Sequence, residues 1–164
     1  MAGRVYNSPL GPLYIAEESG CITQISFMDA DTRKKFQHVS APGSDSGQSP
    51  TMQACLDELD AYFVGRLTSF TVPIKLEGTA FRKRVWEALM TIPYGQTISY
   101  KELALRIDSP KAIRAVGGAN HNNPVSIIVP CHRVIGASGK LVGYGGGLGN
   151  KEFLLELERT TLFA

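Results

Sequence analysis

The stretch "SYKELALRIDSPKAIRAVGGAN", Ser99 to Asn120, decides the fold of the second half of the chain. A helix is expected after Ser99, because Ser99 and Glu102 have the spacing of a capping box. A second helix is expected after a short turn, with Ser109 as its cap and Pro110 at its first position. Two short helices joined in this way predict a helix-turn-helix, a motif found in many DNA-binding domains.

The second of these helices has an unusual composition. It is rich in alanine and glycine, including Ala115 and Gly118, and Arg114 is the one long side chain expected on it. A glycine inside a helix costs about 1 kcal/mol relative to alanine, so close packing against another element is one explanation. The other is a surface for the minor groove, because a helix that reads the major groove normally carries several long polar side chains.

Three further elements are expected around this pair. A helix should begin at the cap Thr79, with an apolar stripe that includes Trp86. Residues 124–130, "PVSIIVP", are typical of a buried strand between two prolines. The last helix should be capped by Asn150, and its inward-facing residues would be Phe153, Leu154 and Leu157.

The first half of the chain has a different pattern. Two strands are expected around a turn at Ser19–Gly20, followed by a flexible loop at 37–50 and a helix at 51–65. A strand with a proline is expected at 69–76, at the edge of a sheet. The sequence therefore predicts an α+β protein with an N-terminal α/β domain, residues 1–76, and a mainly helical domain, residues 77–164.

Composition and charge limit the functions to consider. The 164 residues are 43% hydrophobic and 20% charged, as in a globular protein. No apolar run is long enough for a membrane span and the N-terminus does not resemble a signal peptide, so an intracellular, cytoplasmic protein is expected. Residues 1–76 hold 6 basic and 8 acidic side chains, whereas residues 77–164 hold 11 and 7, which favours a polyanionic partner for the second half.

The segment "VPCHRVIG", Val129 to Gly136, contains the main candidate for chemistry. Cys131 is a buried core residue, a metal ligand or a nucleophile. A metal site is disfavoured, because the three cysteines and three histidines form no C-x-x-C or H-x-x-x-H pair. A nucleophile needs a nearby base, and His132 can serve Cys131 only across a sharp bend or through a water, because neighbouring side chains of an extended segment point to opposite faces.

Three segments resemble the O6-alkylguanine-DNA alkyltransferase family in order and spacing. They are "IPYGQTISYKELA", "SPKAIRAVGGANHNNPVSIIVPCHRVIG" and "GKLVGYGGGLGNKEFLLELE", and the resemblance as a whole runs from about Thr79 to Glu158. The first half matches more loosely, through "SPLGPLYIAEESG" and "LDAYFVG". The resemblance implies a ribonuclease-H-like first domain and a winged-helix-like second domain that holds the active site.

The resemblance also implies roles for the catalytic residues. Cys131 would accept the alkyl group, and His132 would take its proton through a bound water. Glu158 would orient His132, and Tyr100 would assist rotation of the nucleotide and donate a proton to guanine N3.

Further residues would bind DNA and the base. Arg114 would enter the base stack in place of the extruded nucleotide, with Ala115 and Gly118 on the same helix against DNA. Asn123 would tie this helix to the active-site segment. The guanine pocket would be formed by the carbonyls of Cys131 and Val134, with Tyr144 and Gly145 in its wall.

The implied function is direct repair of duplex DNA. Cys131 would take the alkyl group from O6-alkylguanine, and less well from O4-alkylthymine, after base flipping through the minor groove. Transfer would be irreversible, so each molecule would act once, without cofactor or metal. The protein would act as a monomer, alone or with copies that cooperate along DNA, and in a eukaryote it would act in the nucleus. A lesion-binding relative that transfers nothing and a cysteine hydrolase are the alternatives. The first normally lacks the acceptor cysteine, and the second lacks the usual layout of nucleophile and base.

Overall fold

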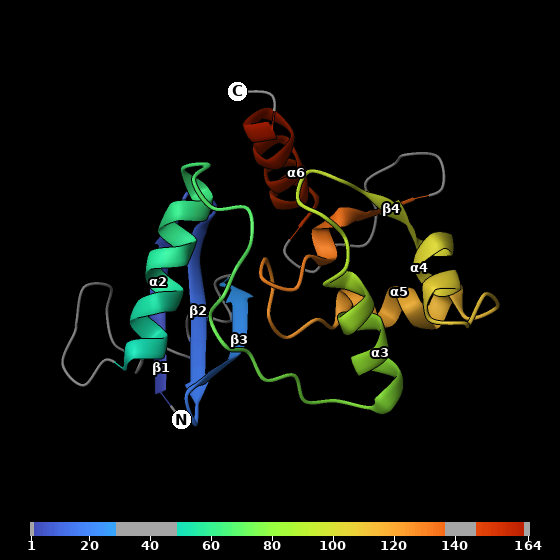
Figure 1. Ribbon diagram of the computed structural model, residues 1–164, viewed down its shortest axis with the longest axis horizontal. Coiled ribbons are helices and arrows are strands. Elements are labelled where there is room, and N and C mark those ends of the chain that lie inside the picture. Colours follow the sequence, from blue (N-terminus) through green and yellow to red (C-terminus); the bar gives the residue numbers. More distant parts are fainter. Residues whose placement is uncertain (1, 29–48, 137–146, 163–164) are drawn as a thin grey trace. The chain divides into compact units, whose positions relative to one another are not determined.

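The computed structural model describes residues 2–28, 49–136 and 147–162 (Figure 1). The chain divides into two compact units, Met1–Leu76 and Glu77–Ala164. The first unit combines a small sheet with a helix, and the second is mainly helical, so the predicted α+β class is confirmed. The loop expected at 37–50 lies almost entirely outside the described residues.

The sheet of the first unit is antiparallel, in the order β1-β2-β3. Its strands are β1 (Ala2–Ser8), β2 (Gly11–Glu18) and β3 (Cys21–Phe27). Ser19 and Gly20 form the predicted turn between β2 and β3, and both have the positive φ that a two-residue hairpin turn requires. β1 was not predicted, because its sequence AGRVYNS contains a single aliphatic β-branched residue.

The helix of this unit is α2 (Pro50–Phe63), close to the predicted range. Ser49 caps it by accepting a hydrogen bond from the Met52 amide. The strand expected at 69–76 is wrong, since only one bridge forms there, between Ile22 and Ile74. Pro73 has no amide hydrogen to donate, so a regular ladder cannot continue past it.

The second unit contains the predicted helix pair. α3 (Ala80–Leu89) is capped by Thr79 and α4 (Tyr100–Arg106) by Ser99, as predicted. α5 (Ile113–His121) begins three residues later than predicted, and Ser109 does not cap it. The Ser109 hydroxyl donates to the Ile107 carbonyl instead, because a turn with Asp108 at φ 56° connects the two helices.

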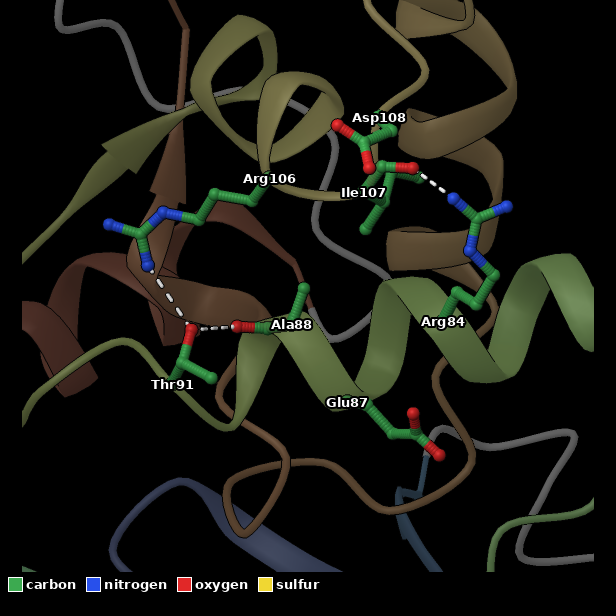
Figure 2. Close-up of a pocket in the computed structure, with 7 residues that line it drawn as sticks. All are labelled: Arg84, Glu87, Ala88, Thr91, Arg106, Ile107 and Asp108. Carbon is green, nitrogen blue, oxygen red and sulfur yellow. Dashed lines mark hydrogen bonds between the residues drawn. The ribbon is translucent and has the colours of Figure 1, made fainter.

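α3 connects α4 and α5 through side chains that bond backbone carbonyls. The Trp86 indole, 2% exposed, donates to the Ala119 carbonyl near the end of α5 at 2.9 Å. Arg84 donates to the Ile107 carbonyl at the end of α4 (Figure 2). Each bond satisfies a carbonyl at a helix end, where the helix itself offers no amide.

The last helix, α6 (Leu148–Leu162), differs in phase from the prediction. It begins before Asn150, so Asn150 is not its cap, and Phe153 is 39% exposed rather than inward-facing. The fully buried residues of α6 are Lys151, Leu154 and Glu158. Two polar residues thus occupy the buried face of α6, which places them against the segment that contains Cys131.

Replacing Trp86 tests how α3 holds α5. Trp86→Phe is expected to lower the free energy of unfolding by about 1–3 kcal/mol, because the buried Ala119 carbonyl loses its donor. Urea unfolding followed by far-UV circular dichroism measures the change, since Trp86 is the single tryptophan. Met90→Ala, at an exposed position just after the same helix, is the control and should change stability by less than about 0.5 kcal/mol. Wild-type stability of Trp86→Phe would show that the indole bond is dispensable.

Candidate functional site

Cys131 is the first residue of a short 3-10 helix, η1 (Cys131–Arg133). The strand expected at 124–130 is wrong: Ile127 has φ 75°, and the chain forms local bonds such as Val129 amide to Val125 carbonyl at 3.0 Å. The run is apolar because it is buried, although it folds as turns. η1 supplies the sharp bend that adjacent cysteine and histidine side chains need to act together, and Cys131 is only 4% exposed.

Asn123 connects the end of α5 to the cysteine. Its side-chain amide donates to the Val129 carbonyl at 2.8 Å and to the Cys131 sulfur at 3.1 Å. Its carbonyl oxygen accepts from the Val125 amide at 3.0 Å. A hydrogen bond donated to sulfur is stronger to the thiolate than to the thiol, so Asn123 favours the reactive form.

Asn120, which the sequence did not single out, also contacts Cys131. Its amide nitrogen donates to the Cys131 carbonyl at 3.3 Å and approaches the Tyr100 hydroxyl at 3.5 Å. It is 1% exposed and lies on the buried face of α5 with Val116 and Ala119. That spacing of three and four residues is the signal that could have revealed it.

Glu158 of α6 holds both residues that follow Cys131. His132 Nε2 lies 2.7 Å from Glu158 Oε2. Arg133 donates to the same carboxylate through Nε at 2.8 Å and Nη2 at 3.0 Å, and the Gly95 amide donates to Oε1 at 3.2 Å. The side chains of His132 and Glu158 are fully buried. This arrangement fixes the orientation of His132 with respect to Cys131.

The environment keeps His132 neutral. Burial lowers the pKa of His132, and the Glu158 carboxylate does not reverse this because Arg133 already balances its charge. Burial alone would raise the pKa of Glu158, but the bonds from His132 and Arg133 hold it well below its ordinary value. A neutral imidazole beside a carboxylate carries its hydrogen on the nitrogen that faces the carboxylate, here Nε2. Nδ1 is then the basic nitrogen, and no hydrogen-bond partner for it is found among the described residues.

Tyr100, the first residue of α4, lies at the same place. β4 (Ile98–Ser99) pairs in parallel with β5 (Val134–Ile135), which brings the start of α4 beside the segment after η1. Burial raises the pKa of Tyr100, so its phenol keeps its proton at neutral pH. The Val134 carbonyl, expected to contact guanine, accepts a hydrogen bond from Lys151. The structure therefore brings Cys131, His132, Glu158, Tyr100 and Val134 together.

The predicted DNA-binding residues of α5 form a surface. Arg114, Ala115 and Gly118 are all exposed, on the side of α5 opposite the buried Val116 and Asn120. Tyr144 and Gly145 lie outside the described residues.

An open pocket at the junction of α3 and α4 does not include this site (Figure 2). It is lined by Arg84, Glu87, Ala88, Thr91, Arg106, Ile107 and Asp108. Arg84 and Arg106 bond the Ile107 carbonyl and the Thr91 hydroxyl across it, so both arginines are engaged within the chain.

No helix in residues 2–28, 49–136 and 147–162 has the length and apolar content needed to cross a membrane. Within the same ranges, no three His, Cys, Asp or Glu side chains are grouped so that they could hold a metal ion.

Two protein-family models match the chain. The model described as "6-O-methylguanine DNA methyltransferase, ribonuclease-like domain" matches residues 1–76. The model for the DNA-binding domain of the same proteins matches residues 80–160. Together they cover both compact units.

Individual relatives are similar over nearly their whole length. A methylated-DNA–protein-cysteine methyltransferase of Mycobacterium tuberculosis is 50% identical over 158 residues, 96% of this chain and 92% of the relative. One from Methanosarcina acetivorans is 48% identical over 154 residues, 94% of this chain and 96% of the relative. The crystal structure of M. tuberculosis OGT in complex with DNA superposes with a TM-score of 0.84 at 47% identity and covers 100% of both chains.

Replacing Glu158 tests the buried network. Glu158→Gln is expected to lower the free energy of unfolding at pH 7 by about 3–5 kcal/mol, because the Arg133 charge stays buried without its carboxylate. The carboxyl pKa is depressed in the folded state, so its contribution is full above about pH 4.5 and is lost as the pH falls further. The difference between wild type and variant, measured by urea unfolding, should therefore shrink below about pH 4.

Glu156→Gln is the matched control, because Glu156 is exposed on the same helix. Its stability should equal that of wild type at pH 7. A difference in stability between wild type and Glu158→Gln that stays constant from neutral pH to about pH 3 would contradict a depressed carboxyl pKa.

Proposed function

The chain belongs to the 6-O-methylguanine DNA methyltransferase family, and we propose on this basis that it repairs DNA directly by transferring an alkyl group from guanine O6 to Cys131. The observation that supports Cys131 most strongly is the set of groups around its sulfur. Asn123 donates to it, and the adjacent His132 is held by Glu158 with Nδ1 as its base. This is the order of nucleophile, base and orienting carboxylate found in enzymes with activated cysteines.

The transfer is a displacement at the alkyl carbon. The Cys131 thiol loses its proton through a water to His132 Nδ1, and the sulfur forms a bond to the alkyl carbon as the bond from that carbon to O6 breaks. The electron pair of the broken bond passes to guanine, which Tyr100 neutralises by donating its phenol proton to N3. The product is a thioether that water does not cleave, so each molecule acts once.

The exposed face of α5 suits access to a base within duplex DNA. An alkyl group on O6 lies inside the duplex, so the nucleotide must leave the stack before Cys131 can reach it. Ala115 and Gly118 let the helix backbone approach the narrow minor groove, and Arg114 is long enough to occupy the space of the extruded nucleotide.

The guanine pocket would use the carbonyls of Cys131 and Val134 as acceptors for the exocyclic amine. In this structure they accept from Asn120 and Lys151. A carbonyl oxygen has two lone pairs, so it can accept from guanine and from its protein donor at once.

The same features disfavour the alternatives. A lesion-binding protein that transfers nothing has no use for a cysteine with a base and an orienting carboxylate. A cysteine hydrolase would form a thioester that water cleaves and would regain its free thiol, whereas the proposed alkyl transfer leaves Cys131 as a thioether, so a mass measurement distinguishes the two. We propose that the protein acts as a monomer wherever the cell keeps its DNA: the cytoplasm, or the nucleus of a eukaryote.

A mass measurement tests the acceptor. Wild-type protein incubated with a duplex that contains one O6-methylguanine should gain the mass of one CH2, located on the peptide that contains Cys131. Cys131→Ser should gain none, whereas Cys21→Ser, the control, should gain as much as wild type. No gain in wild type, or a gain located elsewhere, would refute the proposal.

The role of Arg114 is tested by comparing two substrates. Arg114→Ala should slow the repair of duplex O6-methylguanine about tenfold or more, because an extruded base costs a few kcal/mol to hold out of the stack. Its rate with free O6-benzylguanine, which needs no extrusion, should remain that of wild type. Arg82→Ala, which removes an equal charge from α3, should affect the duplex reaction less. Equal losses of Arg114→Ala on both substrates would exclude a role in extrusion.

A further inference from the structure

Lys151 is a buried charged residue that the proposed transfer does not use. It lies in the first turn of α6, and its side chain is fully buried. A buried ammonium is costly, and replacement by an apolar side chain of similar length would remove the cost. A lysine at this position therefore calls for an explanation in terms of its charge.

The contacts of Lys151 place its ammonium in the active site. It donates to the carbonyl of Val134, three residues after Cys131. It also lies 5.9 Å from the centre of the Tyr100 ring. The Asn120 amide lies within hydrogen-bond distance of both the Tyr100 hydroxyl and the Cys131 carbonyl. Tyr100, whose ring Lys151 approaches, and Cys131 therefore belong to one cluster.

We propose that Lys151 is the counter-charge of the Cys131 thiolate, and that its buried ammonium stabilises the anionic sulfur from which alkyl transfer proceeds. The proposal rests on the proposed role of Cys131 as the nucleophile. Lys151 would not touch the substrate, and it would assist the reaction only by stabilising the negative charge on the Cys131 sulfur.

Electrostatics support this assignment. Burial lowers the pKa of Lys151 to about 8, and a negative charge on Cys131 opposes that change. The interaction is mutual, so the ammonium lowers the pKa of the thiol by the same free energy.

The other groups around the sulfur do not supply this positive charge. From η1, His132 is neutral until it accepts the proton of the thiol, and Arg133 is bonded to Glu158 of α6, so the charges of Arg133 and Glu158 largely cancel. From α4, Tyr100 is a neutral phenol, and from the end of α5, Asn123 contributes an uncharged amide. Lys151 therefore adds a positive charge near Cys131 that is already present before His132 accepts the proton.

The test measures the apparent pKa of the Cys131 thiol in the absence of DNA. Wild type, Lys151→Met and Lys151→Gln are treated with iodoacetamide across a pH series, and modification of the Cys131 peptide is followed by mass. Both variants should raise the apparent pKa of Cys131 by about one unit or more. At pH values below both pKa values, the thiolate fraction of the variant would then be about a tenth of that of wild type. Lys151→Arg should restore part of the shift, which a purely structural role would not require.

Cys21 is an internal control in every sample, because it is partly exposed and belongs to the first unit. Its pH profile should be the same in all proteins. A folded Lys151→Met or Lys151→Gln whose Cys131 titrates as in wild type would overturn the proposal. That outcome is distinguishable from failure of the proposed function, because alkyl transfer from DNA by wild type is measured separately.

A second measurement tests the coupling of Lys151 to Cys131 in the wild-type protein, so it does not depend on whether the variants fold. The 13Cε resonance of Lys151 is titrated in wild type before and after iodoacetamide converts Cys131 to a thioether. The pKa of Lys151 should fall once the anionic sulfur is lost. An unchanged titration would refute the coupling.

Discussion

The buried carboxylate of Glu158 is the constraint on which the rest of the second unit depends. It accepts hydrogen bonds from His132, from Arg133 and from the Gly95 amide, and it is fully buried. A carboxylate in such a place requires these partners, because an isolated buried charge would cost several kcal/mol. The need to satisfy it fixes α6 against η1, and η1 in turn fixes the sulfur of Cys131.

The proposed nucleophile and the proposed DNA-binding surface are connected through α5. Asn120, in the last turn of α5, and Asn123, two residues after its end, donate to Cys131, whereas Arg114 is exposed near the start of the same helix. Trp86 bonds the Ala119 carbonyl and so anchors this end of α5 to α3. A rigid support of this kind suits a protein that acts once, because the site must already be arranged when the base arrives.

Local signals in the sequence were sufficient for some features only. The caps Thr79 and Ser99 were predicted, since capping depends on residues three positions apart. The start of α5 and the turns of 124–130 were predicted wrongly, because tertiary contacts set those backbone angles. The burial of Lys151 was missed, because the rotation of α6 about its axis depends on the partners of its two buried polar residues. Lys151 bonds the Val134 carbonyl, and Glu158 bonds His132. The family resemblance pointed to Cys131, but the bonds around it required the structure.

Glu158 holds His132 with its hydrogen on Nε2, so that Nδ1 is free to accept the proton of the thiol. The most direct measurement is the 15N spectrum of protein labelled at histidine, with His132 assigned by comparison with His132→Gln. We expect Nε2 to stay protonated near neutral pH, and Nδ1 to be unprotonated in the Cys131→Ser variant, which has no thiol. A hydrogen on Nδ1 with a bare Nε2 would contradict it.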